Sequence, residues 1–209
     1  MQDAKCKICR RSGEKLFLKG DKCSSPKCAL LRKPSPPGAS PQKRRRIEVS
    51  EYGKEMKEAQ KIKKMYGIQD RQLKKIVKDI IEKKGQKDAS ETLIKELEMM
   101  LSNIIFRSQL ARSRAEARQL VSHGHFLLNG KKIDIPSAKT KVGDEIKLKE
   151  KSKNNSYFKN ILMMVKTENI PSWLSFDKNN FSIKVVREPS IDEIGDKTNV
   201  PLILSFYSR

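Results

Sequence analysis

The chain has 209 residues, and its 46 lysines and arginines outnumber 25 aspartates and glutamates, so its formal net charge is +21. A protein with this charge repels itself unless a polyanion neutralises it, and the usual polyanions are nucleic acids and anionic membrane surfaces. No run of about twenty apolar residues is present to span a bilayer, and no apolar segment follows the N-terminus as a secretory signal would require. The composition therefore predicts a nucleic-acid partner.

All four cysteines lie in the first thirty residues, as the pairs Cys6/Cys9 and Cys23/Cys28 with thirteen residues between the pairs. Two close pairs joined by a loop are typical of a tetrahedral zinc site, and thiolate is a soft ligand that favours zinc. Four protein ligands would make the metal structural, because no position remains for a reacting water. The alternative is two disulfides, which chains without a secretory signal rarely hold.

Residues 32–46 form a proline-rich arm. Proline at positions 34, 36, 37 and 41 forbids a helix and favours an extended chain. The arm ends in four consecutive cations, Lys43, Arg44, Arg45 and Arg46. An extended arm of one charge can follow the phosphates of a nucleic acid, and the alternative is a linker or a localisation-type basic cluster.

Residues 48–108 place apolar side chains at helical spacing. The pattern predicts one helix from a cap at Ser50 to Gly67, a second from Asp70 to Gly85, and a third that begins at Asp88 or Ser90 and continues to Ile105. The lysines and arginines between the apolar stripes, Lys61 among them, are expected on cationic outer faces. Three of them are predicted to contact RNA: Lys63, Lys64 and Arg71.

The stretch from Ser108 to Glu150 predicts a short helix followed by a hairpin. Ser113 and Glu116 form a capping box at the helix start, and Gly124 supplies the left-handed residue that ends it. Residues 126–128 and 131–133 read as two strands joined by Asn-Gly, the dipeptide that best fits a two-residue turn. Residues 142–148 add a turn and an alternating strand.

This helix has one apolar face, with Leu120 and Val121, and one cationic face. This region resembles a small RNA-binding module shared by a ribosomal protein, several pseudouridine synthases and some tRNA synthetases. The resemblance lies in the order of its motifs: R-x-E-A-R-x-L-V-x-H-G, then a hairpin with N-G, then G-D-x-I. Such contacts follow the shape of a folded RNA; the alternative is an ordinary solvated face. The predicted RNA contacts are Arg107, Arg112, Ser113, Arg114, Arg118, Gln119, Ser122, His123, Lys131 and Lys132.

The C-terminal third predicts further strands and helices. Residues 149–153 read as a charged connector, 157–166 as a helix, 171–177 and 181–186 as two strands, and 191–196 as one more helical turn. Trp173 is expected to pack in a core rather than to stack on a base. Residues 200–209 are too apolar to remain free in water.

Nearly the whole chain resembles the bacterial-type ribosomal protein four of the small subunit, in its zinc-binding, four-cysteine variant. The matching segments are Cys6 to Cys28, Pro36-Pro37-Gly38, Ser50 to Gly53, Lys64 to Ile68, Arg114 to Gly124, Pro171 to Leu174 and Phe206-Tyr207-Ser208. The resemblance implies an α+β fold: a zinc-bound N-terminal segment, a mainly helical domain completed by the C-terminus, and an inserted domain whose small antiparallel sheet carries the helix-hairpin module.

The implied boundaries are residues 1–46 for the zinc-binding segment and basic arm and 47–98 for the first part of the helical domain. Residues 99–187 would form the inserted RNA-binding domain, and residues 188–209 would pack back on the helices. The resemblance also implies a structural protein of cytoplasmic or organellar ribosomes. It would bind the five-prime domain of small-subunit rRNA, nucleate assembly, and lie beside ribosomal proteins three and five near the channel through which mRNA enters, with a role in accuracy.

The alternatives are an RNA-modifying enzyme that carries the same module and another RNA- or DNA-binding regulator. The enzyme would need a larger catalytic domain with a buried aspartate, and the sequence offers no acid/base constellation. His123 and His125 have no nucleophile beside them in a recognisable pattern. We therefore expect no enzymatic activity, no small-molecule substrate and no membrane partner.

Overall fold

The computed structural model describes residues 4–38, 49–82, 88–190 and 198–208. The chain divides into two compact units, which we call unit 1 (residues 1–90 and 196–209) and unit 2 (residues 91–195). The predicted cations at 43–46 and the predicted helical turn at 191–196 lie outside the described residues.

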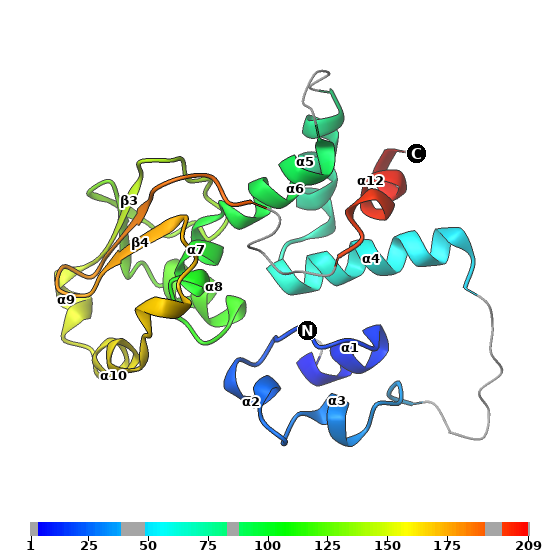
Figure 1. Cartoon of the computed structure of the whole chain (residues 1–209), viewed down its shortest axis with the longest axis horizontal. Helices are drawn as coiled ribbons and strands as arrows, with labels where there is room; N and C mark the ends of the chain where they lie inside the picture. The colour runs from blue at the N-terminus through cyan, green and yellow to red at the C-terminus, as the bar shows by residue number, and fades with distance from the viewer. Residues whose placement is uncertain (1–3, 39–48, 83–87, 191–197, 209) are drawn as a thin grey trace. The chain divides into compact units, whose positions relative to one another are not determined.

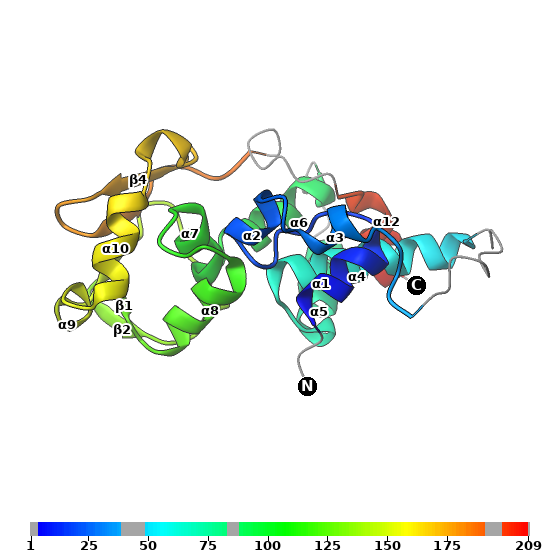
Figure 2. The same ribbon diagram turned by 90° about the horizontal axis from the view of Figure 1, so that it is seen from below.

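Figure 1 labels the α-helices and the strands β3 and β4, and Figure 2 also labels β1 and β2. Unit 1 contains α1 (Lys5–Ser12), α2 (Asp21–Ser24), α3 (Ala29–Arg32), α4 (Glu51–Tyr66), α5 (Asp70–Glu82) and α12 (Val200–Ser208). The helices that follow α5 are α6 (Ala89–Glu98), α7 (Leu101–Arg107), α8 (Arg114–Ser122), α9 (Glu150–Lys153), α10 (Ser156–Met164) and the 3-10 turn η2 (Thr167–Asn169). The strands are β1 (Phe126–Leu128), β2 (Lys131–Ile133), β3 (Glu145–Leu148), β4 (Leu174–Asp177) and β5 (Ser182–Val185).

Helix α4 confirms the first predicted helix of unit 1, and α5 confirms the predicted start of the second at Asp70; its predicted end at Gly85 lies outside the described residues. The Ser50 side chain caps α4 by accepting a hydrogen bond from the Gly53 N–H at 3.3 Å, and α4 ends at Gly67, whose φ is +65°. Ile62 on the apolar stripe of α4 and Leu73 on the apolar stripe of α5 are both fully buried. Capping and periodicity, both readable in the sequence, therefore determine these helices.

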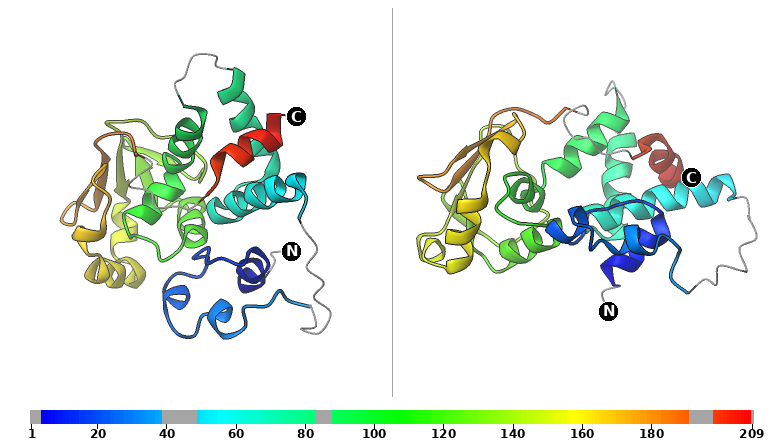
Figure 3. Two further views of the ribbon diagram at one scale, coloured as in Figure 1. Left: turned by 45° about the vertical axis from the view of Figure 1, so that its right-hand side comes forward. Right: turned by 60° about the horizontal axis from the view of Figure 1, so that its bottom comes forward.

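The C-terminal helix α12 packs against α4 and α5, as Figure 3 shows. Ile203 is fully buried in the contact. The Ser205 hydroxyl donates a hydrogen bond of 2.8 Å to the Glu55 carboxylate, which is 5% exposed, and the Tyr207 hydroxyl donates one of 2.7 Å to Asp70. The apolar tail thus completes a core that the earlier helices cannot close alone.

Lys61 is buried, so the prediction that it lies on a cationic outer face is wrong. Its ammonium lies 2.6 Å from a Glu14 oxygen and 3.7 Å from Glu58, and only 7% of its side chain is exposed. Glu14 follows α1, and α1 contacts both α3 and α4 (Figure 2). The ion pair therefore links the cysteine-bearing segment to α4, a contact between distant parts of the chain that periodicity cannot reveal.

The predicted third helix is wrong in length, because the chain bends at Met99 and Met100 and gives two helices, α6 and α7. The N–H groups of Leu101 and Ser102 donate to the carbonyls of Ala138 and Pro136 at 2.9 and 3.0 Å. These bonds to a distant loop replace helical ones. The apolar spacing continues through the break, which is why the sequence reads as one helix.

The described strands form a five-stranded sheet in the order β2-β1-β3-β5-β4, and every neighbouring pair is antiparallel. The predicted hairpin is confirmed: β1 and β2 have the predicted bounds, and Asn129 and Gly130 turn with φ of +48° and +80°. Strands β3, β4 and β5 lie within their predicted segments, and the charged connector contains the short helix α9.

One face of the sheet packs against α7, α8 and α10 and forms the core of unit 2. Phe126, Ile146 and Ile183 of the sheet are fully buried there. Trp173 is 1% exposed in the same core, so the expectation of core packing is confirmed. The opposite face carries Lys132, Lys147, Lys184 and other polar side chains, which follows from the two-residue period of the strands.

We predict that Ser205→Ala lowers the free energy of unfolding of unit 1 by about 1–2 kcal/mol, because it removes a hydrogen bond to a buried carboxylate. The control Ser208→Ala removes an exposed bond and should cost less than about 0.5 kcal/mol. Urea unfolding followed by far-ultraviolet circular dichroism measures the change. Fluorescence of Trp173, the single tryptophan, reports unit 2 and should not move. Equal free energies of unfolding for the two variants would contradict a stabilising role of the Ser205–Glu55 hydrogen bond.

Candidate nucleic-acid interface

Helix α8 begins and ends as its sequence predicts. The Ser113 hydroxyl accepts a hydrogen bond from the Glu116 N–H at 3.3 Å, and Gly124 after the helix has a φ of +67°. The Glu116 carboxylate reaches the N–H of Arg112, at 2.7 Å, one residue further back than the capping box predicts. Val121 is fully buried and Leu120 packs against the core, so the apolar face of the helix is confirmed.

Two of the predicted RNA contacts, Arg107 and Arg114, point at the carboxylate of Glu98. The Arg107 guanidinium donates to both Glu98 oxygens, at 2.9 and 2.8 Å, and the Arg114 guanidinium lies 3.6 Å from one of them. Asn103 donates to Glu98 at 2.6 Å and accepts a hydrogen bond from Arg114 at 2.8 Å. Arg114 also lies over the ring of Phe106, 4.8 Å from its centroid.

Glu98 is completely buried, and the side chains of Arg107 and Arg114 are 19% and 11% exposed. A buried carboxylate is tolerated only when it is paired and hydrogen-bonded, and both arginines supply this. Sequence reasoning missed Glu98. The available signal was its place at the spacing of the apolar stripe formed by Ile94 and Leu101, where a charged residue is unexpected.

Arg118 lies in the middle of α8 and is half-buried. Its Nη1 atom is buried without a hydrogen-bond partner in the described part of the chain. Burial lowers the pKa of its guanidinium, although the group remains charged at neutral pH. An unsatisfied guanidinium nitrogen at the edge of a core is a donor that an anionic ligand can satisfy.

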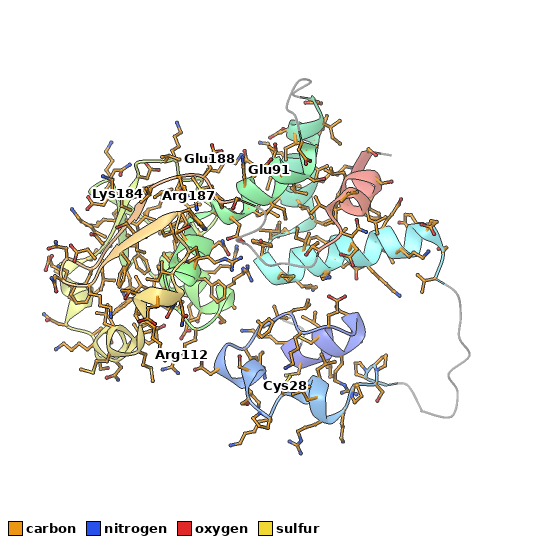
Figure 4. The ribbon with its side chains drawn as sticks, viewed as in Figure 1. Cys28, Glu91, Arg112, Lys184, Arg187 and Glu188 are labelled. Carbon is orange, nitrogen blue, oxygen red and sulfur yellow. The ribbon has the colours of Figure 1, made fainter. Side chains whose placement is uncertain are left out.

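The remaining predicted contacts of unit 2 are exposed, except for Ser113, whose hydroxyl is used in the cap. The exposed ones are Arg112, Gln119, Ser122, His123, Lys131 and Lys132. Figure 4 labels Arg112, next to the start of α8. Among the described residues, no acidic side chain pairs with Arg112, Lys131 or Lys132. We call these six residues the helix-hairpin surface.

Two residues that the sequence analysis did not assign border the helix-hairpin surface. Lys149 follows β3, and its N–H donates to the His125 carbonyl at 2.9 Å. The His125 ring lies 2.9 Å from the Ser152 hydroxyl, and its centroid is 5.4 Å from that of Phe158. Burial lowers the pKa of His125, and the neighbouring charges of His123 and Lys149 lower it further. Strand pairing brings Lys149 here, so its place could not be read from the sequence.

The predicted contacts of unit 1 lie on α4 and α5. Lys63 is paired with Asp70 at 2.5 Å, while Lys64 and Arg71 are exposed. The hydrogen bond from Lys63 lowers the pKa of Asp70, and the bond from Tyr207 lowers it further. Lys63 therefore has a structural partner, whereas Arg71 projects into solvent.

The four cysteines are free thiols, and Cys9, Cys23 and Cys28 are buried. Cys6 and Cys9 lie one turn apart on α1, and the Lys19 N–H donates to the Cys23 sulfur at 3.3 Å. Burial raises the pKa of the Cys9 thiol, and charge on the other three cysteines would raise it further, so the four lie in one neighbourhood. No set of three or more His, Cys, Asp or Glu side chains among the described residues is arranged as a metal site.

No helix in the described parts of the chain is both long enough and apolar enough to cross a membrane.

Unit 2 thus combines a capped helix and a hairpin with cations that have no acidic partner in the described parts of the chain, which are the features of the helix-and-hairpin class of RNA-binding module. Comparison with known proteins gives the family. Residues 1–98 match the model "Ribosomal protein S4/S9 N-terminal domain", and residues 100–146 match the model "S4 domain".

Relatives named "Small ribosomal subunit protein uS4" match along almost the whole chain. The one from Clostridioides difficile is 43% identical over 206 residues, which cover 99% of this chain and 97% of that protein. The one from Thermus thermophilus is 40% identical over 204 residues, covering 98% and 96%. The one from Ruminiclostridium cellulolyticum is 42% identical over 207 residues, covering 99% and 98%. The chain belongs to the family of small ribosomal subunit protein uS4.

We predict that Glu98→Gln destabilises unit 2 by about 3 kcal/mol, because removing one partner of a buried ion pair leaves the other charges uncompensated. Urea unfolding followed by Trp173 fluorescence measures the loss. The control Glu188→Gln removes a carboxylate that is 63% exposed and lies 3.3 Å from Lys95, so it should cost less than about 0.5 kcal/mol. Equal midpoints for the two variants would show that Glu98 does not organise this region.

Proposed function

We propose that this chain is a structural, non-catalytic constituent of the small ribosomal subunit that binds the five-prime domain of small-subunit rRNA. The observation that carries the proposal is the helix-hairpin surface, which lies within the segment that matches the S4 domain. Its cations have no acidic partners among the described residues. Charges held without counterions on a rigid scaffold bind a polyanion by displacing the polyanion's own counterions.

The cations divide by their surroundings into two groups with different roles. Arg107 and Arg114 stabilise the fold through Glu98, and through it they fix the start of α8. Arg112, His123, Lys131 and Lys132 remain available for phosphates. The mechanism is scaffolding: a rigid cationic surface matches one arrangement of RNA helices and so favours that arrangement over others during assembly.

We also propose where the chain lies among the other components of the small subunit. The chain would nucleate assembly and lie beside ribosomal proteins three and five near the channel through which mRNA enters, with a role in translational accuracy. The whole-length relationship to ribosomal proteins named uS4 supports this placement. The cations at 43–46 would contribute to RNA binding from the basic arm.

We further propose that Cys6, Cys9, Cys23 and Cys28 hold one structural zinc ion. The spacing of the two pairs, the burial of three of the thiols and the N–H donated to the Cys23 sulfur support it, since the ligands of a structural metal are buried and accept further hydrogen bonds from the surrounding chain. Zinc would fix the loop between the two pairs. The Lys61–Glu14 ion pair would then transmit this order to α4.

We predict that the double variant Arg112→Ala/Lys131→Ala binds a transcript of the five-prime domain more weakly than the wild type. Each lost phosphate contact lowers the slope of log affinity against log salt by about 1, so the double variant should lose about 2. The charge-matched control Lys78→Ala/Lys159→Ala should keep the wild-type slope. Filter binding over a salt series measures this.

The wild type should bind this transcript in preference to an equally long transcript from another domain and in the presence of heparin. Chemical footprinting locates the protected nucleotides. Equal binding to both transcripts, or full competition by heparin, would refute the proposed function.

We predict that Cys9→Ser removes zinc from the purified protein and lowers the helical signal of the N-terminal segment, because binding the ion and folding are coupled there. The control Ser24→Ala, next to a proposed ligand, should keep the metal. Elemental analysis and circular dichroism measure the two effects. Unchanged zinc content in Cys9→Ser would contradict the ligand set.

A further inference from the structure

Gly124 lies where several cationic side chains of unit 2 converge. A Cβ atom at this position would lie 3.2 Å from Cε of Lys132 and 3.5 Å from Nζ of Lys149. Lys132 belongs to β2 and Lys149 follows β3, so two lysine side chains from different strands approach one backbone position. His123 and His125 flank the glycine in sequence, and their ring centroids are 6.1 Å apart.

Positive charge at this place has no internal compensation. Among the described residues, neither Lys132 nor Lys149 has an acidic side chain within ion-pairing distance. Glu150, the acid next to Lys149 in sequence, is paired with Lys153 at 2.6 Å. Like charges that converge without a counterion repel one another, and an anion placed between them relieves the repulsion.

The scaffold around Gly124 fixes the backbone from which these charges project. The Lys149 N–H donates to the carbonyl of His125 at 2.9 Å, and Gly124 itself donates to the Val121 carbonyl at 2.7 Å. The hairpin register places Lys132 opposite Leu127. Main-chain hydrogen bonds therefore fix the backbone of both lysines before any ligand binds. This lowers the conformational entropy that the protein loses on binding.

We propose that Lys132 and Lys149 form a phosphate clamp over Gly124, occupied by a backbone phosphate of the bound RNA. The proposal rests on the function proposed above and adds Lys149 to the interface. Ammonium groups on flexible stems suit a phosphate because each can donate to any of its oxygens. Glycine suits this position because its φ of +67° favours glycine, and because a Cβ there would press against Cε of Lys132.

A purely structural role is the competing explanation for Lys149. Cations near the C-terminal end of a helix interact favourably with its free carbonyl groups, and Gly124 follows the end of α8. In that case Lys149 would stabilise unit 2 and take no part in binding RNA. The two roles predict different results for the same variant.

The histidines provide a local probe, because His123 and His125 are the only two in the chain. Inorganic phosphate is titrated into the full-length protein at constant ionic strength, with chloride as the matched salt, and the imidazole NMR signals are followed. Phosphate should shift both signals in the wild type. The shift should fall severalfold in Lys149→Gln and stay unchanged in Lys184→Gln, a control on β5 that Figure 4 labels. Equal shifts in all three proteins would overturn the clamp.

Binding of the same proteins to the five-prime-domain transcript gives the second measurement. Lys149→Gln should bind several-fold more weakly, with a salt slope lower by about 1, whereas Lys184→Gln should match the wild type. A lower melting temperature with an unchanged slope would assign Lys149 to the helix end and overturn the clamp. If the wild type fails to bind this RNA, the proposed function fails, and the phosphate titration still tests the clamp independently.

Discussion

The organisation of unit 2 depends on the buried carboxylate of Glu98. It joins the end of α6 to Arg107 at the end of α7 and to Arg114 at the start of α8, while Asn103 completes the network. A charge of this kind is stable in a core only when its partners surround it, so each of these groups fixes the others. The chain bends between α6 and α7 within this network, and α8 leaves it in a defined direction toward the hairpin.

This constraint explains how an excess of positive charge can specify a ligand. Cations that pair internally, such as Lys61 with Glu14 and Arg107 with Glu98, hold elements together and are hidden from solvent. Cations that have no acidic partner within the described part of the chain lie on the helix-hairpin surface and around Gly124. In unit 2 the Glu98 network holds the scaffold from which these cations project, and a rigid arrangement of charges can select one RNA shape over other polyanions.

Unit 1 uses polar contacts in a similar way to close its core. Helix α12 returns to α4 and α5 and carries hydrogen bonds from Ser205 and Tyr207 to carboxylates on those helices. The carboxylates lie 150 and 137 residues earlier in the chain. Helices α4 and α5 and the C-terminal helix therefore depend on each other for stability.

Local physical chemistry determined much of this protein from sequence alone. Neighbouring residues decide the caps at Ser50 and Ser113, the Asn-Gly turn and the alternation of β3. The helix-hairpin module and its family could be identified from such local features. Only the tertiary structure decided which cations are free. Four features depend on contacts between residues that are distant in sequence or that fit a regular pattern: the break at Met100, the burial of Lys61, the Glu98 network and the approach of Lys149 to Gly124. Periodicity records which side chains face a core, but it carries no information about the partner that a buried or half-buried charge will meet.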